Sequence, residues 1–448
     1  MYYIIIHYKY THFLEKTALL LVNNAYYYLY ILHLILNLFK LKLGQIFQYI
    51  LKGTNIMKNI LSESINIKDW LISVRRDLHS TPEFGLKEFI TKDKIIKYLE
   101  EIGIDYKVFK NHTGVVAYIN SPNAKKTIAV RADIDALPIN ENNNVEYKSI
   151  FNGKMHACGH DAHTAILLGT CKLLQEMKDR LHVNIKFFFQ PAEETVGGAK
   201  LMIKDNCMEN PKVDYTLGLH VQPYLECGQV ELQYDTMNAS TDTIKITIEG
   251  KQGHGAYPHL GVDALVVAAN VITSLQTIVS RNTDPTDSIV LSLGVINGGT
   301  KGNIICNKVE IEGTLRTLNP QTRSFAKSRI KDIIEYTCKA HNANGYVDIE
   351  IGYSPLINDN SVVDIVKENS ENLFGKDNVF IRKKASLGAE DFSFFLEHSK
   401  GAFYHLGCGN KSKNITAGLH TADFNIDEDC LPLGVALHIK NIFALSNI

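Results

Sequence analysis

The chain has 448 residues, which is too long for one ordinary hydrophobic core and predicts two domains. Its composition is globular, 45% hydrophobic and 21% charged, and 47 Lys and Arg against 48 Asp and Glu leave no basic excess, which argues against nucleic acid as a partner. The eight cysteines are scattered without a CxxC pair, which favours reduced thiols in a cytoplasmic enzyme over a disulfide framework.

The first 56 residues differ in composition from the rest of the chain. Residues 25–39 (AYYYLYILHLILNLF) are apolar, but the run is shorter than the roughly 20 residues that span a bilayer comfortably. His33 and Asn37 interrupt it, and no small-residue cleavage site is evident. Two interpretations remain: a membrane anchor, or a segment that is dispensable or foreign to the working protein, which would then begin at Met57. We expect the second.

Short apolar segments alternate with helical ones in the next part of the chain. Apolar spacing predicts helices over 67–78, 86–101 and 162–177, the second of them ending at Gly103. Strands are predicted over 115–119, 127–131, 183–189 and 215–219. This alternation favours an α/β sheet covered on both faces. Such sheets place their sites at the carboxyl ends of the strands.

A different order of elements begins near Thr241. Strands are predicted over 243–249, 288–295, 308–315 and 345–351, and helices over 262–281 and 321–340. The resulting order, βαββαβ, is the ferredoxin-like pattern. A helix near 361–374 then returns to the first domain. We therefore expect a split catalytic domain over 57–238 and 353–448, with a satellite domain over 239–352 inserted in it.

The densest group of metal-capable side chains is the run HACGHDAH, which holds His156, Cys158, His160, Asp161 and His163 just before a predicted helix. Thiolate and imidazole are the ligands that zinc prefers, and a helix N-terminus favours the thiolate form of a cysteine. The alternative is a polar helix cap with incidental histidines. The run is therefore a candidate metal site.

Two adjacent carboxylates, Glu193 and Glu194, follow a strongly apolar strand in QPAEE. Side by side near a buried strand they repel each other and lose solvation, which a nearby cation would relieve. One could hold a metal while the other moves a proton, because neighbours in an extended chain point to opposite sides. The alternative is a solvated helix N-terminus, where the macrodipole favours acids.

Isolated polar residues near strand ends are harder to interpret. Asp133, in RADIDALP, could bind a metal, orient a ligand imidazole or only bond its own turn. His220 is expected to end a strand, and nothing in the sequence chooses among His220, His405 and His420 as ligands. These four residues stay candidates.

The predicted satellite domain carries its own polar loops. His254 lies between glycines, which allow the backbone to approach a ligand closely. Asn303 lies in a second glycine-rich loop, and Arg316 at the end of a strand could bind a carboxylate through two hydrogen bonds. Taken singly, each is an ordinary loop or rim residue.

Seven segments in order from Met57 to the C-terminus together resemble one family: RADIDALP, HACGHDAHTA, QPAEE, LGLHVQP, GKQGHGAYPH, GAEDFSFF and LHTADFN. It is the amidohydrolase branch of the dinuclear metallopeptidases, with aminoacylases, hippurate hydrolases, N-acetyldiaminopimelate deacetylases and plant auxin-conjugate hydrolases. The resemblance implies a zinc-peptidase-like catalytic domain and two divalent metal ions, Zn or Mn, with Co or Ni also able to serve. The metal ligands that it implies are Cys158, His160, Glu194, His220 and His420.

The resemblance also implies roles for the remaining candidates. Glu193 would be the general base. The satellite domain would form a homodimer, with His254 reaching the neighbouring subunit's site to stabilise the oxyanion, and with Asn303 helping to hold the substrate carboxylate. From their positions at strand ends, and not from the resemblance, we expect Asp133 to support a ligand from behind and Arg316 to bind substrate. The stretch Gly388–Phe395 would line the pocket.

The activity that these roles imply is hydrolysis of N-acyl amino acids, which are small-molecule substrates. A dipeptidase or carboxypeptidase with the same metals is the alternative enzyme. A membrane-anchored metal- or ligand-binding protein without turnover is the non-enzymatic alternative, suggested only by the apolar N-terminal segment.

Overall fold

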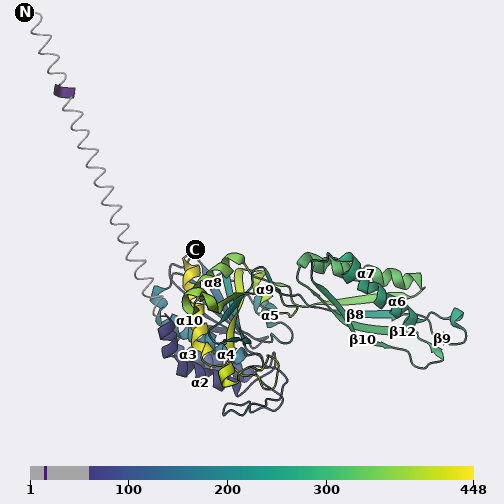
Figure 1. The fold of residues 1–448 in the computed structure, drawn as a ribbon, viewed down its shortest axis with the longest axis horizontal. Helices are drawn as coiled ribbons and strands as arrows, with labels where there is room; N and C mark the ends of the chain where they lie inside the picture. Colours follow the sequence, from purple (N-terminus) through teal and green to yellow (C-terminus); the bar gives the residue numbers. More distant parts are fainter. Residues whose placement is uncertain (1–14, 18–59, 448) are drawn as a thin grey trace, which may run out of the picture. The chain divides into compact units, whose positions relative to one another are not determined.

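The computed structural model describes residues 15–17 and 60–447, so the segment considered as a membrane anchor, 25–39, lies outside the described residues. The chain divides into two compact units, 1–60 and 61–448. The second unit contains two large sheets, each with its own helices (Figure 1).

The first sheet has eight strands. They are β1 (Asp105–Val108), β2 (Val115–Ile119), β3 (Thr127–Asp133), β4 (Asn184–Gln190), β5 (Tyr215–Glu226), β6 (Val230–Leu232), β15 (Val379–Ile381) and β16 (Lys400–Gly409). Their order is β1-β2-β4-β3-β5-β16-β6-β15. The central strands β4, β3, β5 and β16 are parallel, whereas β2 and β6 pair antiparallel with this group. The predicted α/β class is confirmed, and the sheet is mixed.

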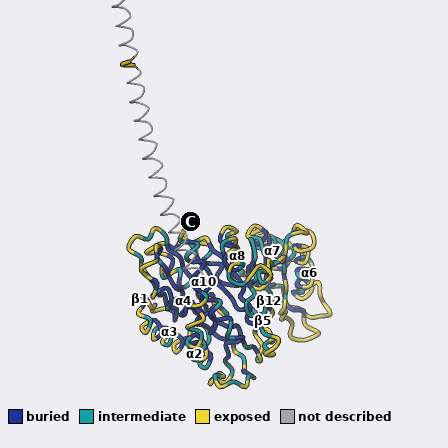
Figure 2. The backbone as a smooth tube through the Cα atoms, turned by 60° about the vertical axis from the view of Figure 1, so that its left-hand side comes forward, coloured by how far each residue is buried: buried dark blue, intermediate teal, exposed yellow. Residues whose placement is uncertain are grey.

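Helices cover both faces of this sheet. The larger helices are α2 (Lys68–His79), α3 (Phe89–Ile102), α4 (His160–Glu176), α8 (Asn360–Phe374) and α10 (Cys430–Ser446), and α4 packs against α2, α3 and α10. The opposite face packs on the short helices α5 (Gly198–Lys204) and α9 (Ser393–Leu396). Because α4 is enclosed on nearly all sides, its first residues are buried together with the site described below (Figure 2).

The sequence predicted the end of α3 correctly but did not predict the strand β16, and each outcome has a local reason. The helix α3 ends as predicted at Gly103, whose φ of +77° belongs to the left-handed region that glycine favours. The central strand β16 was not predicted. All of its ten residues, KGAFYHLGCG, except Lys400 are buried, so the strand shows no alternation of buried and exposed positions.

The second sheet has four strands in the order β10-β12-β8-β13. Its elements are β8 (Asp242–Glu249), α6 (Ala264–Thr277), β10 (Ile289–Gly298), β12 (Lys308–Thr317), α7 (Pro320–Ala340) and β13 (Asn344–Ile351), which is the predicted order βαββαβ. On β8, buried Ile244 and Ile246 alternate with the less buried Thr243 and Lys245, so one face packs on α6 and α7 and the other faces outward. A pair of short strands, β7 (Thr236–Asn238) and β14 (Leu356–Ile357), lies where the chain crosses between the two sheets.

One stretch of the described residues, 264–282, has the length and hydropathy to cross a membrane. Its residues Val267, Val271 and Leu275 are fully or almost fully buried in the core beneath the second sheet. Core packing accounts for this part of the stretch, of which 33% is buried.

Candidate metal centre

The five predicted ligands come together in one cluster. The Cys158 Sγ atom is 3.3 Å from His220 Nε2 and 3.3 Å from His420 Nε2. The Glu194 Oε1 atom is 3.1 Å from His420 Nε2 and 3.9 Å from His160 Nε2. Side chains separated by up to 262 positions in the sequence therefore surround a single small volume.

Two donor groups in the cluster share the Cys158 sulfur. Cys158 lies with His160 and His220 in one group and with Glu194 and His420 in the other, and within each group the ligand atoms lie within 4.8 Å of one another. Sulfur, imidazole and carboxylate are the donors that suit zinc and related ions. The arrangement could hold two cations with the Cys158 sulfur between them.

The position of Cys158 depends on the turn that leads into α4. Gly159 precedes the helix with a φ of +87°, and a Cβ there would lie 2.4 Å from the side chain of Val221. Only glycine fits both demands. The turn brings Cys158 and His160 to the carboxyl edge of the sheet.

Two of the ligand imidazoles are oriented by backbone carbonyl groups. The Nδ1 of His160 donates to Asp135 O at 2.9 Å, and the Nδ1 of His220 donates to Val221 O at 2.7 Å. The lone pair of each Nε2 is thereby left free for the cluster. The Nε2 of His160 is buried and has no hydrogen-bond partner. Since buried polar atoms are nearly always paired, this orphaned nitrogen fits a metal ligand.

His163 belongs to the same sequence run but is already satisfied. Its Nδ1 donates to Asp133 Oδ1 at 2.6 Å, and its Nε2 accepts from the Val221 backbone N–H at 2.9 Å. Both ring nitrogens are used, so His163 is not available as a ligand. The imidazole that Asp133 holds is therefore that of His163, whereas Asp135 holds the ring of His160.

Burial and like charges make the cluster electrostatically costly without a cation. Burial, together with the charges of Glu194 and Glu193, raises the pKa of the Cys158 thiol well above its usual value. Burial, with the neighbouring carboxylates Glu390 and Glu194, raises the pKa of Glu193 strongly. A divalent cation reverses both effects because it favours the ionised forms. The donor set therefore fits a metal.

The two adjacent glutamates face the same cluster. Strand β4 ends at Gln190, Ala192 has a φ of +55°, and the chain turns at 193–196 instead of staying extended. Carboxylate oxygens of Glu193 and Glu194 both lie within 4.8 Å of a His160 nitrogen. The expectation that they point to opposite sides is wrong, because the turn brings both carboxylates to one side.

The structure separates the three candidate histidines that the sequence could not. His220 lies inside β5, not at its end as predicted, and pairs across the sheet with His405 on β16. The Nδ1 of His405 is 3.1 Å from Glu231 Oε2 and 3.2 Å from the Tyr224 hydroxyl. His220 and His420 thus join the cluster, and His405 belongs to a neighbouring polar group.

The three candidates from the second sheet lie elsewhere in the chain. His254 is in β9 (Gly253–His254), which pairs with β11 (Ile304–Ile305), and Asn303 O accepts from the Gly255 N–H at 2.9 Å. His254 and Asn303 are therefore neighbours, and both are exposed. Arg316 Nη1 donates to Leu387 O at 2.8 Å. None of the three is in the five-residue cluster.

The structure also reveals a buried arginine whose role was not predicted. Arg131 donates to Gln190 Oε1 at 2.8 Å, to Asp133 Oδ2 at 2.7 Å, and to Glu390 and Asp391 at 2.9 Å each. Arg131 therefore links Asp133, which bonds the His163 ring, to Glu390 and Asp391. These two acids lie beside Glu193. The segments RADIDALP and GAEDFSFF carry these residues, but the sequence gives no sign that they meet.

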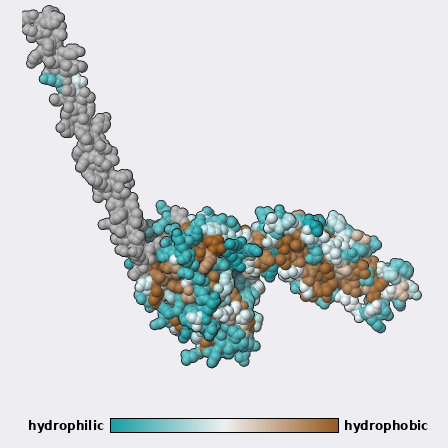
Figure 3. Space-filling model, in the orientation of Figure 1, coloured by the Kyte–Doolittle hydropathy of each residue, from teal (hydrophilic) through white to brown (hydrophobic). Residues whose placement is uncertain are grey.

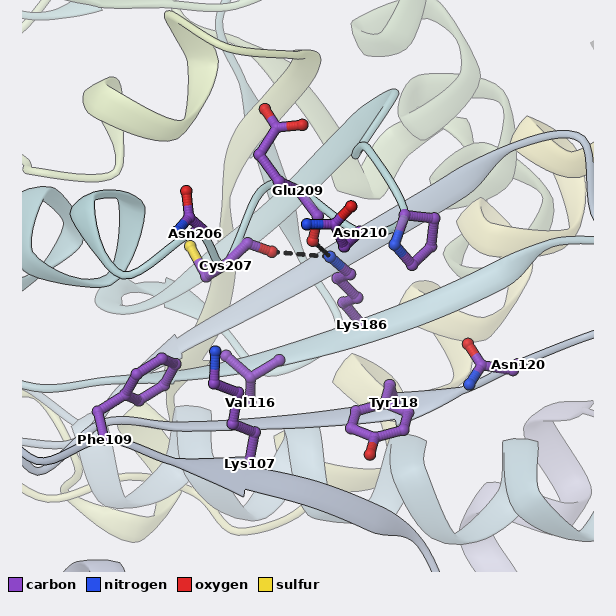
Figure 4. A pocket seen from close by; sticks show the side chains of 11 residues that line it. Lys107, Phe109, Val116, Tyr118, Asn120, Lys186, Asn206, Cys207, Glu209 and Asn210 are labelled. Atoms are coloured by element: carbon purple, nitrogen blue, oxygen red, sulfur yellow. Dashed lines mark hydrogen bonds between the residues drawn. The ribbon is translucent and has the colours of Figure 1, made fainter.

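A cavity of about 440 Å³ lies away from this cluster (Figure 4). Its lining includes Lys107, Phe109, Tyr118 and the buried Lys186 and contains no residue of the cluster. The Lys186 ammonium donates to the backbone carbonyls of Cys207 at 2.9 Å and Glu209 at 2.7 Å. Lys186 is thus used to hold the loop at one side of the cavity.

Known proteins of similar sequence and structure support this description. Residues 129–443 match peptidase family M20/M25/M40. The chain is 40% identical over 361 residues to N-acetyl-L-cysteine deacetylase of Bacillus subtilis (strain 168), covering 81% of this chain and 84% of that protein. It is 35% identical over 397 residues to thermostable carboxypeptidase 2 of Saccharolobus solfataricus, covering 88% of this chain and 100% of that protein.

A solved structure agrees with the sequence relatives. The Bacillus subtilis YXEP protein, described as a dinuclear metal-binding peptidase from the M20 family, matches with a TM-score of 0.74 and 29% identity, covering 85% of this chain and 99% of that one. The chain belongs to peptidase family M20/M25/M40, in its amidohydrolase branch, and is a hydrolase of amide bonds.

Replacing Cys158 by Ala should lower the amount of metal that the protein binds, because both ligand groups lose their shared sulfur. Elemental analysis of the purified variant measures this, and we expect the metal content to fall by roughly half or more. Cys171→Ala, a buried thiol within α4, is the matched control and should keep its metal. Unchanged stoichiometry in Cys158→Ala would remove this residue from the ligand set.

Proposed function

We propose that the chain is a metal-dependent amidohydrolase that cleaves N-acyl amino acids to a carboxylate and a free amino acid. The single observation that carries the proposal is the five-residue donor cluster with the Glu193 carboxylate beside it. The 40% identity to a protein named for deacetylating N-acetyl-L-cysteine supports the substrate class.

The donor geometry supports the proposed ligand roles. We assign Cys158 to both metal positions, His160 and His220 to one, and Glu194 and His420 to the other. Zinc or manganese is our first choice, and cobalt or nickel would fit the same mixed donors. Asp133 would support the ligand residues from behind through its hydrogen bond with the His163 ring.

The protein's own residues would move the proton in the reaction. Bound divalent cations would lower the pKa of the attacking water and polarise the amide carbonyl. Glu193 takes the proton as the water oxygen bonds to the carbonyl carbon, and passes it to the nitrogen as the C–N bond breaks. The buried position of Glu193, 8% exposed, keeps bulk water from competing for that proton.

The proposal also assigns a role to the second sheet and its helices. We assign the part of the chain between about 239 and 352 as a ferredoxin-like satellite domain, with the catalytic domain formed by 57–238 and 353–448. Its elements carry exposed apolar side chains, among them Leu265 and Val266 on α6 and Val295 and Ile296 on β10, which would suit a homodimer contact. Hydrophobic residues, in brown, are visible over these elements in Figure 3.

Across such a dimer, exposed His254 would reach the partner subunit's site and stabilise the oxyanion, a contribution of about 3 kcal/mol for a donor of this kind. Asn303 and Arg316 would bind the substrate carboxylate. We assign no catalytic role to residues 1–56, and we place the enzyme in the cytoplasm.

A carboxypeptidase or dipeptidase activity is the second candidate, because one relative is named a carboxypeptidase. A panel of N-acetyl and N-benzoyl amino acids, assayed beside matched dipeptides with the full chain, separates the two. We expect the higher kcat/KM on the N-acyl amino acids. Turnover confined to the dipeptides would favour the second candidate, and no turnover on either set would contradict both.

Replacing Glu193 by Gln should leave the metals bound but lower kcat by about 100-fold or more, because general-base catalysis contributes roughly that much. Steady-state kinetics and elemental analysis on one preparation measure the two effects together. Glu101→Gln, an exposed change on α3, should match the wild type. Near-normal kcat in Glu193→Gln would show that another group accepts the proton.

A further inference from the structure

Tyr353 joins three segments that meet beside the catalytic glutamate. It lies between β13 and β14, in the segment by which the chain returns from the second sheet to the first. Its hydroxyl donates to the backbone carbonyl of Glu193 at 2.6 Å and lies 3.4 Å from that of Thr195. A side chain from the crossing segment therefore holds the backbone of the general base.

The ring of Tyr353 is fixed from two sides. It packs edge-on against Phe394, with centroids 5.9 Å apart. On the other side it lies against Gly197, where an added Cβ would be 2.7 Å from the ring. Because Gly197 has no Cβ, the loop leaves room for the ring, and its φ of +76° is a second reason for glycine at this position.

The crossing segment is itself tied to the other crossing of the chain. The Thr241 N–H donates to the Tyr353 carbonyl at 3.0 Å, so the outgoing and returning segments are bonded at this residue. One residue thus connects both crossings to the loop that carries Glu193.

The loop has other fixed points on either side of Glu193. The Ala192 N–H donates to Glu88 Oε1 at 2.9 Å, the Glu194 N–H donates to Asp135 Oδ2 at 3.0 Å, and the Ala199 N–H donates to Asp391 Oδ2 at 3.0 Å. The Glu193 carbonyl itself is bonded by the Tyr353 hydroxyl. The Glu193 carboxylate itself lies among the acids Glu194, Glu390 and Asp391, which repel it. Its position therefore depends on how firmly its backbone is held.

We propose that Tyr353 is a positioning residue for the general base: its hydroxyl fixes the Glu193 peptide so that the carboxylate stays at the metal cluster. The inference rests on the proposed function, since it assigns Glu193 to the proton transfer. The same bond makes the base sensitive to the geometry of the crossing between the two sheets.

The test is Tyr353→Phe in the full chain, which keeps the ring and removes the hydroxyl. We expect kcat on an N-acetyl amino acid to fall about ten- to a hundred-fold, the range that small misplacements of catalytic groups cause. KM, metal content and melting temperature should stay at wild-type values. Tyr106→Phe, whose hydroxyl donates to Glu100 at the surface, is the matched control.

Hydrogen exchange supplies a readout that does not need activity. Peptides covering residues 193–198 should exchange faster in Tyr353→Phe than in the wild type or in Tyr106→Phe. Unchanged exchange and unchanged kcat would overturn the proposal, as would a loss of kcat that only follows a loss of metal. If exchange is faster in Tyr353→Phe but the wild type cleaves no N-acyl amino acid, the positioning role of Tyr353 is upheld and the proposed function is rejected.

Discussion

The structure depends on a cluster of buried negative groups that needs positive charge to exist. Cys158, Glu193 and Glu194 meet at the edge of the first sheet. Burial raises the pKa of Cys158 and of Glu193 well above the usual values, whereas at Glu194 burial is outweighed by the hydrogen bond with His420 and by His160, which lower its pKa. Arg131 supplies the positive charge for the acids behind them, and it is fully buried. In the cluster itself His420 Nε2 lies 3.1 Å from Glu194 Oε1, and the buried His160 Nε2 has no hydrogen-bond partner. Divalent ions would complete that balance, and the chemistry of the site and its stability would then have the same origin.

The fold brings this cluster together by placing the contributing loops at one edge. Strands β3, β4 and β5 are parallel neighbours, so the end of β3, the loop that follows β4 and His220 within β5 come side by side. The helix α4 begins at the same edge through Gly159. His420 arrives from a distant loop whose backbone is anchored by a hydrogen bond from its own N–H to Ala157 O at 2.8 Å. The ligands are therefore held by the sheet, by a helix start and by one long-range backbone bond.

Much of this could be predicted from the sequence, for identifiable reasons. The alternation of apolar segments predicted the class of the fold and most element positions, since periodicity records which face is buried. The donor types in HACGHDAH and QPAEE predicted a metal site. The sequence could not predict that His405 bonds Glu231 while His220 joins the cluster, since both lie in buried strands. Arg131 and Tyr353 were also missed, because their partners lie 259 and 160 positions away in the chain.

The central claim is that one cation-filled cluster carries the hydrolysis. The most direct test removes metal from the full chain with a chelator and then adds divalent ions back in steps, recording bound metal and turnover of an N-acetyl amino acid together. The account predicts no turnover without metal and recovery as two ions bind per chain, the number expected from the dinuclear relative. Full turnover in the metal-free protein, or recovered turnover with no ion bound at the cluster, would contradict it.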